Sequence, residues 1–548
     1  NNKYVSWTFR KKSGFFDCVT FTGNGTTLPY ISQTVSHNLG AVPAMMIVKQ
    51  TSGANGWVVY HKDIGNTHNL TLDETTAAEA GGLVAWNNTT PTDTVFTVGA
   101  DSNLTNKSGQ TFVAYLFADN SAEDLDDQMI KCGSYTGTAA DLSINLGWEP
   151  QFVLVKNTSS ARNWRMLDSM RGVATEGNAS ILAPNIGDAE FNAPDFFRFN
   201  SLGFELDASG GADVNSNGDS YIYMAIRAPM MVEPEAATDV FAPVNYTGDD
   251  QMPDNITGFG FSPDMLIFSR RDATSNHRIY DRLRGFSNGD LITDDTAAEN
   301  STGDQILQGP TIMDGFRIAP SGTNYLNTTG VLYHSLGWKR AKGFFDVVCY
   351  PQVANTAHAV PHSLGVVPEM MWIKTRDSGN GWQVYTSAVG ATSYLHLNEN
   401  YNYSTRQDRF NNTAPTATHF TVGTASTTNG GNQIAYLFAS LDGISKCGSY
   451  TGNGSYQTID CGFSAGARFV LIKRANIAVS GNEGDWYFWD SVRGIVAGND
   501  PHFSINTTAV HVTTDDSVDP ANAGFIVNQV SATNINVSSS TYIFYAIA

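Results

Sequence analysis

The sequence Leu39-Gly40-Ala41-Val42-Pro43-Ala44-Met45-Met46-Ile47-Val48-Lys49 joins a tight turn to a short apolar run that ends on a charge. Glycine adopts backbone conformations that a Cβ would strain, and proline cannot donate a hydrogen bond to a strand ladder. The two residues therefore mark the entrance to a strand. A run of about five large apolar or β-branched residues after such a signal predicts a strand that is buried on both faces.

Variants of this stretch recur along the chain. Close copies are residues 146–156, 259–268 and 364–374. A looser copy, 462–473, has Ala465 where the others have proline, and two extra residues before the strand. Five such strands predict five similar domains in a chain of 548 residues, because single domains usually hold about 100–200 residues. The equivalent core position of each buried strand is predicted to hold Ile47, Leu154, Ile267, Trp372 and Leu471.

The predicted fold class is all-β, a tandem array of about five antiparallel, jelly-roll-like β-sandwich domains with little helix. The 51 glycines and the charged fraction of only 15% agree with many strands joined by tight turns. We number the domains modules 1 to 5. Their predicted bounds are 12–119, 130–229, 240–339, 340–439 and 444–548. Residues 1–11 are predicted to be the end of a preceding unit.

The modules are of two types. Phe420-Thr421-Val422-Gly423 of module 4 repeats Phe96-Thr97-Val98-Gly99 of module 1, and residues 446–452 of module 5 repeat residues 131–137 of module 2. Module 3 is closer to the second type. In every module we expect the first strand to pair with the last. Because the connectors are short, we also expect neighbouring modules to stack in a semi-rigid row.

The charge and hydropathy of the chain exclude some classes of partner. A net charge of −20 argues against a protein that tracks nucleic-acid phosphates and against adhesion to anionic lipid. No apolar run approaches the roughly 18 residues that a membrane helix needs, so we expect no membrane insertion. The five cysteines show no CxxC spacing. Cys447 and Cys461 flank a predicted hairpin and could pair across it, but free thiols are the stronger expectation.

One charged motif recurs in modules 2, 3 and 5. An aspartate is followed three residues later by an arginine and then by a glycine. The pairs are Asp168 with Arg171, Asp281 with Arg284, and Asp490 with Arg493. Such a pair could be a catalytic acid beside an anion clamp. A structural turn locked by a carboxylate–guanidinium bond is the better interpretation, because no nucleophile or base accompanies the three copies.

Two further patterns have the residue types of a metal site. The oxygen-bearing residues Asp213, Asn215, Asn217 and Asp219 have the spacing of a calcium loop. No glutamate follows at the distance that such a loop requires, so a hairpin turn is the first interpretation and calcium the weak alternative. His37 and His362 precede equivalent turns and are expected to bond to them rather than to hold metal. We predict no cofactor, no metal and no catalytic residue.

The motifs together resemble a known group of proteins. Residues 4–11, the Gly-Phe-Phe-Asp of residues 14–17, residues 37–43, Lys131 to Gly137 and Leu146 to Lys156 are similar to large virion proteins of tailed bacteriophages. Those of marine and cyanobacterial hosts, described as tail-fibre or structural proteins, are the nearest in character. The resemblance covers essentially the whole chain and implies a role in assembly and host contact. It supplies no catalytic or receptor-binding residue.

We therefore expect a non-enzymatic structural protein of a phage virion, a fibre or appendage segment for host-surface attachment. It would be assembled in the host cytoplasm and would contact other virion proteins, host-surface glycans and copies of itself, with a homotrimer as the expected assembly. Tyr401 and Tyr403 are candidates for the subunit contact or for glycan stacking. One alternative is a head-decorating or filament-forming protein. Another is a carbohydrate-binding or glycan-degrading tailspike, which would need two carboxylates about 5–10 Å apart in a cleft.

Overall fold

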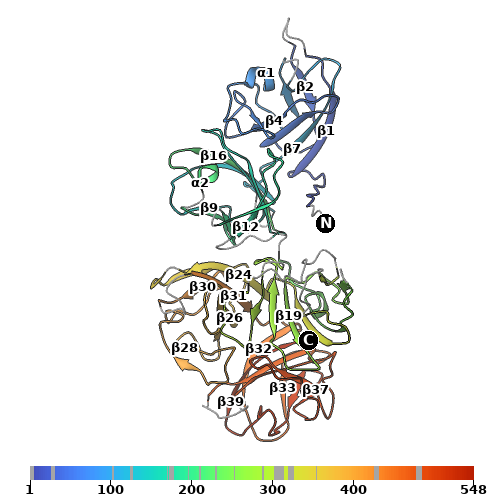
Figure 1. Ribbon diagram of the computed structural model, residues 1–548, viewed down its shortest axis with the longest axis vertical. Helices are drawn as coiled ribbons and strands as arrows, with labels where there is room; N and C mark the ends of the chain where they lie inside the picture. Colours follow the sequence, from blue (N-terminus) through green and yellow to red (C-terminus); the bar gives the residue numbers. More distant parts are fainter. Residues whose placement is uncertain are drawn as a thin grey trace. The chain divides into compact units, whose positions relative to one another are not determined.

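The computed structural model divides into two compact parts, unit 1 (Asn1–Met230) and unit 2 (Met231–Ala548) (Figure 1). Antiparallel strands dominate both units. The helical segments of the described residues are α1 (Gly82–Trp86), α2 (Gly211–Val214) and the 3-10 turn η1 (Ala237–Asp239). The structure describes residues 5–25, 31–100, 104–123, 127–169, 171, 178–194, 197–208, 211–228, 231–251, 254–286, 289–300, 314–318, 326–352, 354–424, 431–476 and 484–548.

All five predicted modules follow one plan. A main sheet places the last strand between the first and the third strand, and the fourth strand lies beyond the third. A smaller cover sheet pairs the second strand with the strand that comes just before the last one in the sequence. The predicted pairing of first with last strand is confirmed in every module. The all-β, sandwich-like architecture is therefore as the sequence predicts.

Unit 1 contains two copies of this plan. The strands of module 1 are β1 (Phe16–Thr22), β2 (Gln33–Ser36), β3 (Met45–Gln50), β4 (Trp57–His61), β5 (Leu70–Thr71), β6 (Val95–Val98) and β7 (Thr111–Phe117). Those of module 2 are β8 (Ile130–Thr136), β9 (Leu142–Asn145), β10 (Pro150–Asn157), β11 (Arg165–Asp168), β12 (Asn178–Ile181), β13 (Phe191–Pro194), β14 (Phe197–Asn200), β15 (Gly203–Leu206) and β16 (Ser220–Arg227).

Unit 2 contains three copies. Module 3 has β17 (Phe241–Thr247), β18 (Asp254–Ile256), β19 (Met265–Arg270), β20 (Arg278–Asp281), β21 (Leu291–Ile292), β22 (Phe316–Ile318) and β23 (Leu332–Trp338). Module 4 has β24 (Phe345–Gln352), β25 (His358–Pro361), β26 (Met370–Thr375), β27 (Gln383–Thr386), β28 (Ser393–Tyr394), β29 (Ser404–Thr405), β30 (His419–Val422) and β31 (Gly431–Phe438). Module 5 has β32 (Ser445–Thr451), β33 (Gln457–Asp460), β34 (Phe469–Arg474), β35 (Trp486–Asp490), β36 (His502–Ser504), β37 (Val518–Ala521), β38 (Gly524–Val527) and β39 (Thr541–Ile547).

The recurring turn behaves as its glycine predicts. Its glycine has a positive φ in every copy, which only glycine adopts without strain. The angles are +70° at Gly40, +87° at Gly147, +78° at Gly260, +77° at Gly365 and +76° at Gly462. The strand that follows is buried on both faces, as expected, because successive side chains point to opposite sides of a sheet. In β26, for example, Met371 and Ile373 pack under the cover sheet of module 4, whereas Met370 and Trp372 face away from it.

The outward-facing residues of the third strands have an unexpected partner. Ile267, Trp372 and Leu471 are each 1% exposed and belong to one cluster, to which the main sheets of modules 3, 4 and 5 all contribute. Ile47 and Leu154 lie in a corresponding cluster of modules 1 and 2. The predicted core positions are thus confirmed as buried. The semi-rigid row is wrong for unit 2, because three main sheets share one apolar core, and burial of that face requires all three at once.

Candidate functional site

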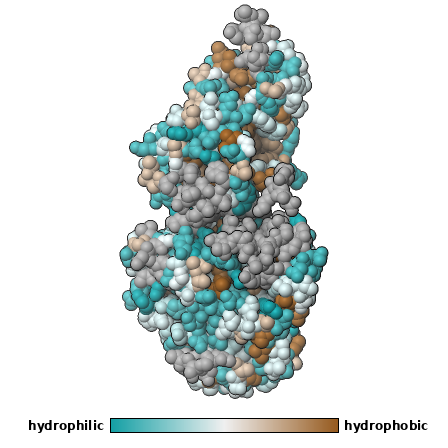
Figure 2. Space-filling model, viewed as in Figure 1, coloured by the Kyte–Doolittle hydropathy of each residue, from teal (hydrophilic) through white to brown (hydrophobic). Residues whose placement is uncertain are grey.

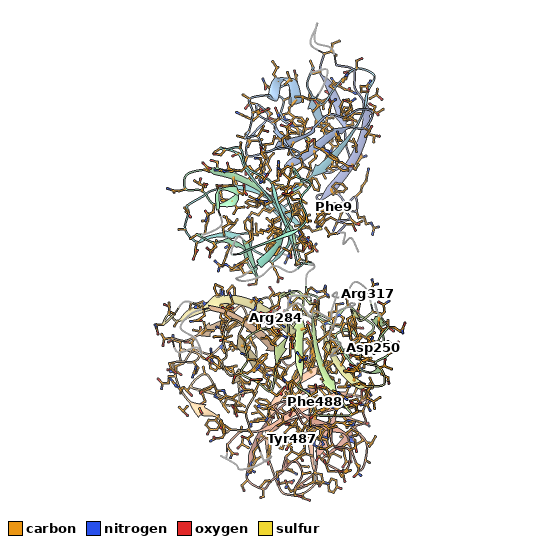
Figure 3. All side chains as sticks on the ribbon, in the orientation of Figure 1. Phe9, Asp250, Arg284, Arg317, Tyr487 and Phe488 are labelled. Atoms are coloured by element: carbon orange, nitrogen blue, oxygen red, sulfur yellow. The ribbon has the colours of Figure 1, made fainter. Side chains whose placement is uncertain are left out.

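The Asp–Arg turn of module 3 lies at the end of β20, and its Asp281 and Arg284 are 0% and 1% exposed. Arg284 is labelled in Figure 3. Arg284 Nε lies 2.5 Å from Asp281 Oδ2, and the Arg284 backbone N–H donates to Asp281 Oδ1 at 2.9 Å. Arg284 also donates to Glu299 Oε1 at 3.1 Å. Module 4 completes the network, since Arg376 Nε donates to Glu299 at 2.6 Å and Tyr436 OH donates to Asp281 at 2.7 Å. Two carboxylates therefore meet two guanidinium groups across the boundary between modules.

The copies in modules 5 and 2 have the same local geometry. Arg493 Nε lies 2.5 Å from Asp490 Oδ2, and Arg171 Nε lies 2.6 Å from Asp168 Oδ2. In both, the backbone N–H of the arginine donates to the other carboxylate oxygen at 3.0 Å. Each aspartate thus ties its arginine and the turn backbone together, as a structural lock would. In the module 2 motif, residues 170 and 172 lie outside the described part of the chain.

Two of these aspartates, Asp281 and Asp490, also meet the closing strand of another module. Tyr436 of β31 bonds to Asp281, and His334 Nε2 of β23 lies 3.1 Å from Asp490 Oδ2. In unit 1, the Trp7 indole N–H donates to Asp168 Oδ2 at 3.2 Å. The turn motif is therefore part of the seam between modules. This second role depends on contacts between residues more than 150 positions apart, so the local spacing of Asp and Arg does not indicate it.

The electrostatics of the turns favour a permanent ion pair over acid–base chemistry. Burial raises the pKa of Asp490, but the charge of Arg493 outweighs burial and holds that pKa well below its usual range. Burial likewise opposes ionisation of Glu299, yet Arg284 and Arg376 keep the pKa of Glu299 lowered. A general acid or base needs a pKa near the working pH. These carboxylates stay ionised at neutral pH and are saturated with donors, so they can lock a turn but cannot relay protons.

The calcium-loop candidates do not converge. Asp213 pairs with Arg165 and accepts from the Asn163 N–H, whereas Asn215 uses its amide to bind backbone groups of residues 138, 140 and 207. Asp219 accepts from Asn157 Nδ2 at 2.8 Å, and Asn217 is exposed. The described residues contain no group of three or more His, Cys, Asp or Glu placed to hold a metal ion.

The two turn histidines bind their own turns, as predicted. His37 Nε2 lies 3.2 Å from the Thr92 carbonyl, and its Nδ1 accepts from the Leu39 N–H at 3.2 Å. His362 makes the same contacts with Thr416 and Leu364 at 3.1 and 3.3 Å. All five cysteines are free thiols, Cys447 and Cys461 included, and burial raises the pKa of both of those thiols. Thiols held protonated by burial are poor nucleophiles and poor metal ligands.

A second seam element escaped the sequence prediction. In modules 2 to 5, a tryptophan or histidine at the start of the fourth strand, or just before it, donates from its side chain to a backbone carbonyl of another module. The bonds run from Trp382 to Ile292 O at 2.7 Å, from Trp486 to His396 O at 2.8 Å, from His277 to Ser504 O at 3.1 Å and from Trp164 to Thr71 O at 3.0 Å. In unit 2 these bonds form a closed cycle, from module 4 to 3, from 3 to 5 and from 5 to 4.

One sequence signal does accompany this element. In every module the backbone N–H of this tryptophan or histidine donates to an Asp or Asn side chain of the same module. These bonds join Trp57 to Asp73, Trp164 to Asn185, His277 to Asp294, Trp382 to Asn398 and Trp486 to Asn506. A tryptophan or histidine followed 16 to 21 residues later by Asp or Asn thus recurs in every module. In modules 1, 3, 4 and 5, that Asp or Asn lies two residues after the carbonyl that accepts the bond from another module. In modules 3, 4 and 5 the pattern marks both a donor and an acceptor of the bonds between modules.

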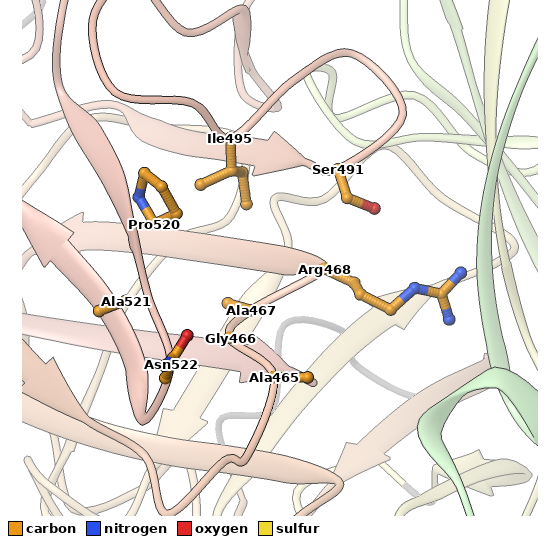
Figure 4. A pocket seen from close by; sticks show the side chains of 9 residues that line it. All are labelled: Ala465, Gly466, Ala467, Arg468, Ser491, Ile495, Pro520, Ala521 and Asn522. Carbon is orange, nitrogen blue, oxygen red and sulfur yellow. The ribbon is translucent and has the colours of Figure 1, made fainter.

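A surface hollow of about 570 Å³ lies in module 5, beside the turn that lacks the proline (Figure 4). Ala465, Gly466 and Ala467 form one wall, and Arg468 is its one charged lining residue. Arg468 Nη1 donates to the Phe241 carbonyl at 3.1 Å, so its charge is used within unit 2. The lining also includes Ser491 and Asn522 but no carboxylate or histidine, so it lacks the side chains that most often act as a general acid or base.

In the described part of the chain no helix is long and apolar enough to cross a membrane. No curated protein matches the chain. A solved structure, "Crystal Structure of the STIV MCP", has 12% sequence identity and a TM-score of 0.12, covering 39% of this chain and 95% of that chain. A family model, domain of unknown function DUF7483, matches residues 3–229 and 236–548. Because these two stretches span almost the whole sequence, the chain belongs to the DUF7483 family.

Proposed function

We propose that this protein is a non-enzymatic structural component of a phage virion, a fibre or appendage segment that attaches to the host surface. The observation that carries the proposal is a repeated module whose buried charged and aromatic side chains form hydrogen bonds to neighbouring modules. Such a chain supplies stiffness and repeated loops rather than a reaction centre. The resemblance of its repeated motifs to tailed-phage virion proteins gives the particle in which this stiffness would be used.

The buried charges support a mechanical role. Arg284 and Arg493 have no exposed side-chain surface, and their aspartate partners are equally enclosed. Enzymes place perturbed groups in clefts that substrate can enter. Here the ionised groups lie inside seams, where they specify how modules meet. Figure 2 shows a face on which hydrophilic residues predominate and hydrophobic ones form small patches, which suits a particle surface bathed in water.

The exposed aromatics of module 4 are the proposed contact for host glycans. Tyr401 is 59% exposed and Tyr403 is 38% exposed, although large aromatic side chains are usually buried. Flat, exposed rings can stack on the apolar faces of sugars. Many weak contacts of this kind add through avidity when a virion carries several copies.

Labelled imaging tests the location. An antibody against the chain, visualised by negative-stain microscopy of purified virions, should decorate the tail or its appendages. Label on the capsid surface would replace the attachment role with head decoration. A filament free of virions would favour the self-assembling alternative. Release of sugars from host envelopes by the purified protein would instead indicate a glycan-degrading tailspike.

A binding assay tests the aromatic contact. The double variant Tyr401→Ala, Tyr403→Ala should reduce retention on bacterial cell-envelope preparations, marine and cyanobacterial ones included, by about tenfold or more under multivalent display. Tyr456→Ala is the matched control, because Tyr456 is also 59% exposed but lies in module 5 and bonds to Asp516. Equal retention of the double variant and the control would exclude these two tyrosines as the contact.

The homotrimer belongs to the same proposal. Mass photometry at micromolar concentration should show a species of three chain masses. A clean monomer would count against a trimeric fibre and favour a module that depends on the virion surface for its order. The shared core of unit 2 already supplies lateral packing of three sheets within one chain, so unit 2 does not need a trimer for its own stiffness.

A further inference from the structure

Besides Arg376, three side chains of module 4 donate hydrogen bonds to module 3. Trp382 donates to the Ile292 carbonyl at 2.7 Å, and Lys374 Nζ donates to the Thr296 carbonyl at 3.1 Å. Tyr436 OH donates to Asp281 at 2.7 Å. All three donors are fully buried. Module 3 therefore provides hydrogen-bond acceptors for all three buried donors on this face of module 4.

Module 1 carries the same three donors at the same strand positions. Trp57 and Lys49 occupy the places of Trp382 and Lys374, and Tyr115 occupies the place of Tyr436. The ring stacking is also the same, with centroids 6.4 Å apart in the Trp57–Tyr115 pair and 6.2 Å apart in the pair of module 4. Yet none of the three donors of module 1 bonds to another module in the described part of the chain.

The exposure of this face differs in the same direction. Trp57, Lys49 and Tyr115 are partly exposed, whereas their equivalents in module 4 are fully buried. Cys18, opposite Tyr115 on the neighbouring strand, is partly exposed, and Val347, its equivalent, is 1% exposed. The same apolar and hydrogen-bonding face is thus covered in unit 2 and open in unit 1.

Residues 5–10 contact module 2 through Trp7. Trp7 contacts Phe152 of β10 with ring centroids 6.1 Å apart. The equivalent Phe469 is contacted by β23 from a different position, Trp338, at 5.6 Å. Trp7 also donates to Asp168, the counterpart of the aspartate beside His334. Residues 5–10 thus contact module 2 at the two residues equivalent to those that β23 contacts in module 5. They pair with no strand in the described residues, whereas β23 lies between β17 and β19.

We infer that modules 1 and 2 of unit 1 correspond to modules 4 and 5 of the closed cycle in unit 2. A third β module, similar to module 3, would then dock on the partly exposed face of module 1 formed by Trp57, Lys49 and Tyr115. The occupant is the segment that runs into residue 5, and residues 5–10 are its last strand. It would supply the carbonyls for Trp57 and Lys49 and a buried aspartate for Tyr115. The Ala183 carbonyl of module 2, which holds the acceptor position two residues before Asn185, would accept from the docked module as the Ser504 carbonyl accepts from His277.

Hydroxyl-radical labelling of the full chain, read by mass spectrometry, provides the first test. At sub-micromolar concentration Trp57 and Tyr115 should react at least tenfold faster than Trp382 and Tyr436. Equal protection of the two pairs would overturn the inference, because the face would then be closed already. Protection of Trp57 that appears on raising the concentration, with doubling of the particle mass, would assign the face to a second copy and also overturn it.

A graft provides the second test. Residues 240–332 are joined in front of residue 4 of the full chain, so that residue 4 takes the place of Tyr333. The graft should slow labelling of Trp57 and Tyr115 to the rates of their equivalents in unit 2. A second graft, residues 240–340 joined to Lys12, keeps module 3 intact and is used if the first does not fold. The control graft carries Ile267→Asp in the added module and should leave Trp57 reactive. A folded graft that leaves Trp57 and Tyr115 as reactive as before would refute the docking of this class of module.

Discussion

Modules 1 and 4 are built from nearly the same sequence plan, yet their seam faces have different environments. Lys374 is fully buried and donates to two modules, whereas Lys49 is partly exposed and donates to the Asn55 carbonyl of its own module. The pKa of Lys374 is lowered to about 8 by burial. The difference teaches that the module by itself does not decide burial. The number of neighbouring main sheets decides it, and the same side chain is a core residue in unit 2 and a surface residue in unit 1.

The largest effect is expected from a charge in the shared core. Trp372→Asp should destabilise unit 2 by several kcal/mol, because an unpaired buried carboxylate has no compensating partner there. Since three modules share that core, hydrogen exchange should accelerate in β19, β26 and β34 together, while β3 of unit 1 stays protected. Val367→Asp is the control, because Val367 belongs to the same module and is 46% exposed. Loss of protection confined to module 4 would contradict the shared core.

The next effect compares two copies of the Asp–Arg turn. Arg284→Met should lower the free energy of unfolding by about 3–5 kcal/mol. The change leaves the buried Asp281 without its charge partner and removes one of the two arginines that pair with Glu299. Arg171→Met should cost less, about 1–2 kcal/mol, because its second partner Glu190 is 42% exposed and stays hydrated.

Guanidinium unfolding followed by hydrogen exchange measures the two losses separately for each unit. Adding Asp281→Asn to Arg284→Met should recover part of the stability by removing the stranded charge. Equal losses for the two arginine variants would show that enclosure does not distinguish the turns.

Acid should separate the two units through their buried histidines. Burial lowers the pKa of His277 to about 4, and the same cause lowers the pKa of His61 in unit 1 to about 4. A histidine with a depressed folded pKa contributes stability that is complete above about pH 6.5 and is lost as the pH falls toward 4. For His277 the loss is about 3 kcal/mol.

The His277→Gln variant isolates this contribution, because glutamine does not titrate. Between pH 7 and pH 4 the stability of unit 2 should fall more in the parent chain than in the variant. His61→Gln should change the acid response of unit 1 only. Parallel pH curves for parent and variant, followed by denaturant unfolding, would rule out His277 as a source of acid sensitivity.

The smallest effect distinguishes a closed seam from an open one. Trp486→Phe removes the indole N–H that bonds to the His396 carbonyl and should cost about 1–3 kcal/mol, because a buried acceptor loses its partner. Trp57→Phe should cost under about 0.5 kcal/mol, since this indole bonds to no acceptor in the described residues. Thermal unfolding of the two variants measures both values, and a loss for Trp57→Phe as large as for Trp486→Phe would contradict the open face.

Much of the module was predictable from local patterns. The Leu-Gly turn and the apolar run after it repeat at similar intervals, and the alternation of side chains in a strand makes both faces of that run apolar. Pairing of the first with the last strand follows from the repeated opening and closing motifs. The Asp–Arg motif was visible as a unit because its two partners are only three residues apart.

The seam was not predictable in the same way. Trp382 and Ile292 are 90 residues apart, as are Trp486 and His396, and His277 reaches Ser504 across 227 residues. No local pattern encodes which module will cover which face. The short connectors suggested a row, but connector length limits only the distance between neighbours and leaves their orientation free.

The sequence by itself therefore determined the repeated β module, the pairing of its first strand with its last and the residues that are apolar on both faces of the third strand. These depend on backbone preferences and a two-residue period, which are properties of neighbouring residues. Only the tertiary structure decided that one of those faces is shared among three modules in unit 2 and partly open in unit 1. That outcome depends on burying apolar area and on pairing distant donors with acceptors, which become defined only when whole sheets meet.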